Sequence, residues 1–255
     1  MIDSDYVMIM NVGRTGSTWL SSLLGRHPEV LDACETNFFA TTEEATGPER
    51  YGVNQIVLAW INRHTGVTPI PLSLLSRDEL AEVIHDHVID ICSRALATSG
   101  ARVMVDKSPA HMLSVASQDL IHNLIPKATM IHLVRDFRAV WLSFKARFPD
   151  YWLVWSGVSG FCDTVSAAYD SMDRITGGLA MPTFRYEDIK ADPSRISGIL
   201  SAIGVDSSPE IVSSLVYKAD LRRGSFDGWT AGDDPDVQVV SERLWHLLTR
   251  YGYEK

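Results

Sequence analysis

The hydrophobic residues of this chain occur in two patterns, short continuous runs and longer segments in which they recur every three or four positions. The short runs predict strands over residues 7–10, 30–33, 102–106, 129–134 and 181–186. The periodic segments predict helices over residues 17–24, 52–64, 77–98, 109–124, 137–147, 157–175, 193–203, 209–217 and 237–251. Because strands and helices alternate, we expect an α/β fold whose central parallel sheet is flanked by helices. We place the 30–33 strand beside the 7–10 strand.

The first strand runs into a short loop that precedes a helix. Such a loop directs unpaired backbone N–H groups, and the positive end of the helix dipole, toward one point. Gly13 and Gly16 let a ligand approach the backbone closely. Arg14 adds a fixed positive charge, and Ser17 and Thr18 add hydroxyl donors. The stretch is therefore either a site for phosphate or sulfate or an ordinary tight turn.

Composition narrows the class of protein. The chain has 255 residues, 45% of them hydrophobic, so it can bury a large core, and we expect one domain over residues 1–255. A formal net charge of −9 argues against a protein that coats nucleic acid. Cys34, Cys92 and Cys162 are widely spaced, which supports neither a disulfide framework nor a zinc site.

Two features of the apolar pattern bear on location. No apolar run approaches the roughly 20 residues of a membrane span, so we expect no membrane partner. The first strand begins almost at the first residue, which leaves no room for a signal peptide. We therefore expect a cytoplasmic protein.

Charged residues follow four of the predicted strands. Arg14 and Glu35 come after the first two strands, and Lys107 and Arg135 come after the next two. The carboxyl ends of parallel strands share one edge of the sheet, and ligands bind at that edge in open α/β folds. We therefore place the active site there.

Several motifs together resemble the sulfotransferases that use 3′-phosphoadenosine 5′-phosphosulfate (PAPS). Residues 13–18, Gly-Arg-Thr-Gly-Ser-Thr, resemble the 5′-phosphosulfate motif of that family, usually written P-[RK]-S-G-T-T. A strand that ends in Arg135, with Ser143 eight residues later, resembles its 3′-phosphate motif. The remaining similarities favour the protein-tyrosine sulfotransferase-like branch, and they are His27-Pro28-Glu29-Val30 with Glu35-Thr36, Asp106-Lys107-Ser108-Pro109, and Arg185-Tyr186-Glu187-Asp188 with Asp192-Pro193.

The resemblance implies a P-loop nucleoside triphosphate hydrolase-like fold and sulfuryl transfer from PAPS, with 3′-phosphoadenosine 5′-phosphate (PAP) as the product and no metal required. It implies that Glu35 is the general base and that Arg14 and Lys107 stabilise the transferring group. The residues that it implies for donor binding are Arg14, Thr15, Gly16, Ser17, Thr18, Trp19, Arg135, Ser143, Arg147, Tyr186, Arg222 and Arg223.

Alternatives remain open at this point. His27, His111 and His132 are other candidates for the base. A phosphotransferase of the related fold is an alternative function, although the opening loop lacks the late lysine of G-x-x-x-x-G-K-[ST]. A non-catalytic nucleotide-binding module is another. We expect the acceptor to be a hydroxyl on a small metabolite, a sugar or a carrier-bound intermediate, and the aromatic stretch 151–155 favours a partly apolar one.

Overall fold

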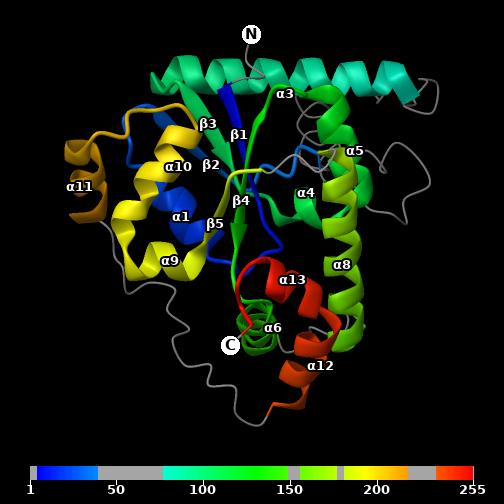
Figure 1. Ribbon diagram of the computed structural model, residues 1–255. Helices are drawn as coiled ribbons and strands as arrows, with labels where there is room; N and C mark the ends of the chain where they lie inside the picture. The colour runs from blue at the N-terminus through cyan, green and yellow to red at the C-terminus, as the bar shows by residue number, and fades with distance from the viewer. Residues whose placement is uncertain (1–4, 40–76, 149–155, 177–180, 218–233, 255) are drawn as a thin grey trace.

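The computed structural model describes residues 5–39, 77–148, 156–176, 181–217 and 234–254 (Figure 1). Within these residues five strands form one parallel sheet in the order β2-β3-β1-β4-β5. The strands are β1 (Tyr6–Met10), β2 (Val30–Cys34), β3 (Val103–Asp106), β4 (Thr129–Val134) and β5 (Thr183–Arg185). The predicted α/β fold with a central parallel sheet is confirmed.

The prediction that the 30–33 strand lies beside the first strand is wrong, because β3 lies between them. Met104 is in register with Tyr6 of β1 on one side and with Leu31 of β2 on the other. Each residue of β3 is buried, whereas most of β2 is only half-buried. The strand whose residues are all buried thus occupies the interior of the sheet, and the half-buried strand occupies the edge.

Helices cover both faces of the sheet (Figure 1). The side chains of β1 alternate, so that Val7 and Ile9 enter one hydrophobic cluster and Tyr6 and Met8 enter the other. The first cluster is covered by α1 (Ser17–Leu24), α9 (Tyr186–Ala191), α10 (Ile196–Ala202) and α11 (Pro209–Tyr217). The second is covered by α3 (Arg77–Ser99), α4 (Pro109–Leu113), α5 (Val115–Leu124), α8 (Gly157–Ile175), α12 (Pro235–Arg243) and α13 (Trp245–Arg250).

The helix α6 (Phe137–Arg147) follows β4 and lies beyond the carboxyl end of that strand (Figure 1). Asp136 begins this helix, because its side chain accepts a hydrogen bond from the N–H of Arg138. Arg135 therefore lies in the two-residue connection between β4 and α6. This connection places one of the four predicted charged residues at the expected edge of the sheet.

Two of the predicted helices are interrupted. Ser114 has an extended backbone and its hydroxyl caps α5, so the segment 109–124 divides into α4 and α5. Leu244 likewise separates α12 from α13 within the predicted segment 237–251. The predicted helix over 52–64 lies outside the described residues. No described helix has the length and apolarity that a membrane crossing needs.

Candidate active site

Residues 11–16 connect β1 to α1, and Asn11 holds this loop in shape. Its side-chain oxygen Oδ1 accepts hydrogen bonds from the Gly13 N–H at 2.9 Å and from the Thr15 hydroxyl at 3.3 Å. Its amide group donates to the carbonyl oxygens of Ile9 at 2.9 Å and Lys107 at 3.3 Å. One buried side chain thus fixes the loop and joins it to the turn that follows β3.

The loop ends at Gly16, which is the N-cap residue of α1. Gly16 has a left-handed backbone with φ of 89°, and it has no side chain to accept hydrogen bonds from the first turn of the helix. A Cβ atom here would come closer than 3.0 Å to two ring carbons of the buried Tyr186. The first-turn N–H groups are thus available to an anionic ligand, and the Tyr186 ring packs against the loop at Gly16.

Positive charge gathers around this loop. The Arg14 guanidinium donates from Nε to the Ser143 hydroxyl at 3.1 Å, and Arg135 donates from Nη1 to the Arg14 carbonyl oxygen at 3.1 Å. Arg135 is 6% exposed, and its guanidinium lies 4.9 Å from the centre of the Tyr186 ring. Partial burial, followed by the positive charges of Arg147 and Arg135, lowers the pKa of Arg14.

Within the part of the chain that the structure describes, these three guanidinium groups have no carboxylate partner. Among the residues that the structure describes, no ion pair joins Arg14, Arg135 or Arg147 to an aspartate or glutamate. Guanidinium groups that crowd together without acidic neighbours repel one another, and an anion between them relieves that repulsion. The arrangement is therefore suited to a ligand that carries phosphate or sulfate groups.

Glu35 and Lys107 form an ion pair at the same edge of the sheet. Lys107 follows β3, and its side chain is 3% exposed, whereas Glu35 follows β2 and its side chain is 46% exposed. The buried lysine holds the carboxylate at the protein surface, where a second molecule can reach it. This geometry allows the carboxylate to accept a proton beside a fixed positive charge.

The structure places the remaining predicted residues as follows. Thr15 is buried and its hydroxyl is bonded within the loop, whereas Thr18 is exposed. Ser17 is buried at the start of α1, and Trp19 packs edge-to-face on Tyr186 with ring centres 6.0 Å apart. Arg222 and Arg223 lie outside the described residues.

The three histidines that were alternatives to Glu35 are buried and bonded. The two ring nitrogens of His27 contact the Asp206 carbonyl oxygen and the Glu29 N–H. His111 accepts a hydrogen bond from the Phe39 N–H at Nε2, and burial lowers its pKa, against the opposing effect of Asp106.

His132 lies in the core, 2.7 Å from the Tyr169 hydroxyl oxygen, and burial lowers its pKa to about 3. None of the three histidine rings is exposed to an incoming acceptor.

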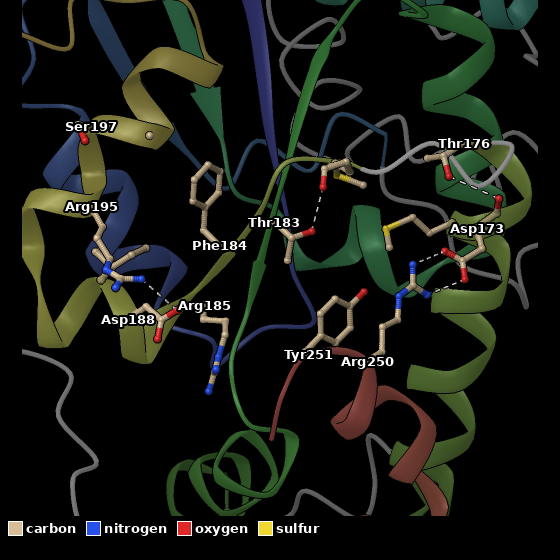
Figure 2. A pocket seen from close by; sticks show the side chains of 14 residues that line it. Asp173, Thr176, Thr183, Phe184, Arg185, Asp188, Arg195, Ser197, Arg250 and Tyr251 are labelled. Atoms are coloured by element: carbon tan, nitrogen blue, oxygen red, sulfur yellow. Dashed lines mark hydrogen bonds and ion pairs between the residues drawn. The ribbon is translucent and has the colours of Figure 1, made fainter. Parts of the chain in front are cut away.

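A cavity of about 730 Å³ lies elsewhere, along β5 between α8 and α13 on one side and α9 and α10 on the other (Figure 2). No described member of the predicted site lines it. Two of its three arginines are paired, since Arg250 bonds Asp173 at 2.7 Å and Arg195 lies 3.5 Å from Asp188 (Figure 2). The third, Arg185, packs on the Tyr253 ring, with its guanidinium 4.2 Å from the ring centre. Cations that already have carboxylate partners attract an added anion less than the cluster around Arg14 does.

Sequence reasoning missed one residue of the site and undervalued another. Asn11 was not among the predicted site residues, although a polar residue at the end of a buried strand is itself a signal. Asp106 was named only as part of the motif Asp106-Lys107-Ser108-Pro109. Both act through partners far away in the sequence, Lys107 for Asn11 and Tyr6 for Asp106, and a linear pattern does not contain such partners.

The parallel sheet, with a glycine-containing loop between β1 and α1, defines an α/β protein of the P-loop-like class. Comparison with known proteins then identifies the group within this class. The sequence profile of the sulfotransferase family matches residues 6–209, so the chain belongs to the sulfotransferase family. Whether it belongs to the protein-tyrosine branch stays a prediction. No curated protein sequence matches this chain.

Solved structures of sulfotransferases share the fold. The sulfotransferase domain from the curacin biosynthetic pathway is 17% identical, with a TM-score of 0.59, over 94% of this chain and 96% of that one. A sulfotransferase from Mycobacterium avium is 14% identical, with a TM-score of 0.55, over 96% and 76% of the two chains. The sulfotransferase domain from the olefin synthase of Synechococcus PCC 7002 is 21% identical, with a TM-score of 0.50, over 92% and 81%.

Proposed function

We propose that this sulfotransferase moves a sulfuryl group from PAPS to a hydroxyl group of a small molecule, with Glu35 as the general base. The observation that carries the proposal is the Glu35–Lys107 ion pair, which shares the carboxyl edge of the sheet with the anion-binding loop. A base and a cluster of cations on one edge are the two parts that transfer of an anionic group to a hydroxyl requires.

The residues present fit such a donor. The first turn of α1, with Arg14, is suited to the 5′-phosphosulfate, and Arg135, Ser143 and Arg147 are suited to the 3′-phosphate. PAPS supplies the sulfuryl group, and PAP leaves with the electrons of the broken S–O bond. Tyr186 supports Arg135 and the loop through ring contacts.

The acceptor hydroxyl forms the new O–S bond as it loses its proton to the Glu35 carboxylate. Lys107, which contacts this carboxylate, neutralises negative charge on the sulfuryl oxygens as the group moves. Catalysis then consists mainly of alignment and charge neutralisation, as in phosphoryl transfer. We propose no metal in this step.

One observation favours Glu35 over the histidines as the base, and a second argues against a phosphotransferase. Its side chain is half-exposed, whereas His27, His111 and His132 are buried and bonded to neighbouring groups. The loop also lacks the lysine with which nucleotide phosphotransferases of the related fold hold their phosphates, since Ser17 and Thr18 follow Gly16.

The acceptor class is a hydroxyl on a small metabolite, a sugar or a carrier-bound intermediate. Two of the similar structures are sulfotransferase domains from the curacin biosynthetic pathway and from an olefin synthase. Hydroxylated biosynthetic intermediates are therefore the first acceptors to test.

A binding measurement separates the donor classes. We expect PAP to raise the unfolding temperature of the protein, with a stabilisation of about 2.7 kcal/mol at a hundredfold excess over the dissociation constant. ATP with Mg²⁺ at equal concentration is the comparison. A larger shift with ATP and Mg²⁺ than with PAP would favour the phosphotransferase and contradict the proposed donor.

A pair of variants then tests the base. Glu35→Gln should lower transfer of radiolabelled sulfate to an acceptor by about 100-fold or more, because general-base catalysis contributes roughly 10²–10⁴-fold. Its affinity for PAP should stay close to that of the wild type.

Glu29→Gln is the matched control, because Glu29 precedes β2 as Glu35 follows it, and among the described residues its side chain forms an ion pair with Arg102 at the surface. Unchanged transfer by Glu35→Gln would remove Glu35 from the role of base. A wild type that binds PAP but transfers sulfate to none of the acceptors would instead support the non-catalytic module.

A further inference from the structure

The buried carboxylate of Asp106 lies between the segments that carry Glu35 and Lys107. Asp106 ends β3 and is 1% exposed. Its Oδ1 accepts hydrogen bonds from the N–H and the hydroxyl of Ser108, at 2.9 and 2.6 Å. Its Oδ2 accepts hydrogen bonds from the Tyr6 hydroxyl at 2.6 Å and from the Thr36 hydroxyl. Each carboxylate oxygen thus accepts two hydrogen bonds, so the roughly four lone-pair sites of the carboxylate are all occupied.

These donors come from three parts of the chain that are distant in the sequence. Tyr6 belongs to β1, Thr36 follows Glu35 beyond the end of β2, and Ser108 belongs to the turn after β3. The Thr36 N–H also lies 3.5 Å from Oδ1 of Asp106. A residue whose N–H and hydroxyl both contact one buried carboxylate has little freedom, so the backbone of the preceding residue is fixed as well.

Further hydrogen bonds extend this network on both sides of the ion pair. The Ser108 hydroxyl accepts from the Asn37 N–H at 2.9 Å, and the Lys107 N–H donates to the Cys34 carbonyl oxygen at 3.0 Å. The segment 34–37 is therefore bonded to the segment 106–108 on either side of Glu35. The ion pair between Glu35 and Lys107 is a further link between these two segments.

A buried carboxylate is costly to desolvate, and it persists in a core only where hydrogen bonds compensate for the lost water. At 1% exposure, Asp106 is bonded to two hydroxyl groups from other segments, Tyr6 and Thr36. An apolar side chain could fill this position without the cost of desolvating a carboxylate. The network therefore points to a requirement for defined placement of the segments that it joins.

We propose that Asp106 is a positioning residue for the Glu35–Lys107 pair and acts through Thr36 and Ser108. The proposal rests on the proposed function, since it assigns the alignment of the proposed base to this network. Asp106 itself does not touch the acceptor or the donor. Its effect is to hold the Glu35 carboxylate within the small range of positions from which proton transfer is efficient, because a displacement of about 1 Å can reduce a rate by about 10²-fold.

The test compares two substitutions of one residue. Thr36→Val keeps the shape of the side chain and removes the hydroxyl that bonds Asp106, whereas Thr36→Ser keeps the hydroxyl. We expect Thr36→Val to lower kcat for sulfate transfer by about 10- to 100-fold. The dissociation constant of PAP should change less than about twofold, because the hydrogen bonds from Gly13 and Thr15 to Asn11 that fix the loop do not involve Thr36. Thr36→Ser should recover kcat to within about threefold of the wild type.

Asp106→Asn is a second, harsher variant, because an amide has one acceptor oxygen in place of two. It should lower kcat at least as much as Thr36→Val does. If it fails to fold, the threonine pair still decides the question. Equal kcat values for Thr36→Val and Thr36→Ser would overturn the proposal, and so would a loss of PAP affinity as large as the loss of kcat.

Hydrogen exchange supplies a readout that does not depend on activity. Thr36→Val should speed amide exchange at Asn37, whose N–H donates to Ser108 in this network, and leave the loop 11–16 unchanged. It should also speed exchange at Phe39, whose N–H donates to His111, since the His111 ring lies 3.7 Å from Asp106. If the wild type transfers no sulfate and exchange changes as expected, the proposed function fails while the network stands. If the wild type is active and neither exchange nor kcat responds to Thr36→Val, the positioning role fails alone.

Discussion

The contact between Gly16 and Tyr186 gives a prediction whose size follows from the structure. Gly16→Ala adds a methyl group at a backbone with φ of 89°, where an L-residue costs about 1–2 kcal/mol. The new Cβ would also come closer than 3.0 Å to the Tyr186 ring, inside the ordinary carbon–carbon contact distance of about 3.5–4.0 Å. Forcing a buried group to move costs about 1–3 kcal/mol. We therefore expect a loss of about 2–5 kcal/mol in the free energy of unfolding.

Gly100→Ala is the matched control. Gly100 follows α3, has φ of 72°, and a Cβ there would meet nothing within 4 Å. It carries the same backbone penalty without the overlap, so its loss should be about 1–2 kcal/mol. With roughly 2–4 °C per kcal/mol for a chain of this size, the control should lower Tm by about 2–8 °C, and Gly16→Ala by about 4–20 °C.

The assay is thermal or urea unfolding of the two variants beside the wild type, together with titration by PAP. Gly16→Ala should also weaken PAP binding, because displacement of Tyr186 disturbs the support of Arg135. Equal stability losses for the two variants would show that the ring does not press against Gly16. That result would refute the account of how the loop is supported.

Two further predictions concern pH and donor binding. Burial lowers the pKa of His132 to about 3, whereas the pKa in the unfolded chain is about 6.5. The unfolded chain therefore gains a proton at His132 before the folded protein does. The folded state loses stability from this ring as the pH falls from about 6.5 toward 3, and loses none above that range. In urea unfolding at pH 7 and pH 5, the wild type should lose about 2 kcal/mol more than His132→Gln, and parallel losses would contradict the assignment. Arg135→Met should weaken PAP binding by roughly 10- to 150-fold in calorimetry, since a hydrogen bond to a charged group contributes about 1.5–3 kcal/mol. Arg250→Met, in the cavity along β5, is its control, and equal losses of affinity for the two variants would argue against the anion site around Arg14.

Local patterns in the sequence predicted the elements of the fold, but they did not predict the order of the strands. The strands predicted over 129–134 and 102–106 are observed as β4 and β3, the latter beginning at Val103. The position of β3 between β1 and β2 depends on which strands bury both faces, and that is decided by helices from other parts of the chain. The break at Ser114 was missed for a similar reason, because the hydroxyl that caps α5 sits within an otherwise helical pattern.

The candidate site, too, was predicted in part: the sequence indicated where its charged residues lie but not how their side chains pair. Charged residues after strand ends predicted that Arg14, Glu35, Lys107 and Arg135 share one edge, because parallel strands end together. The pairing of Glu35 with Lys107, however, depends on side-chain directions that periodicity does not carry. The motif spacing likewise related Arg135 to Ser143, but the structure links the two through Arg14, which contacts both.

The end of β2 has a consequence for how this protein meets other chains. Its pairing with β3 shifts register between Asp32 and Cys34, and Cys34 has a left-handed backbone with φ of 59°. An edge strand is ordinarily a template on which another chain can add a strand, and a bulge removes the regular ladder that such addition needs. Within the described residues the opposite edge is β5, which has only three residues. The bulge at the end of β2, which precedes Glu35, therefore also hinders the addition of strands from other chains and so protects against aggregation.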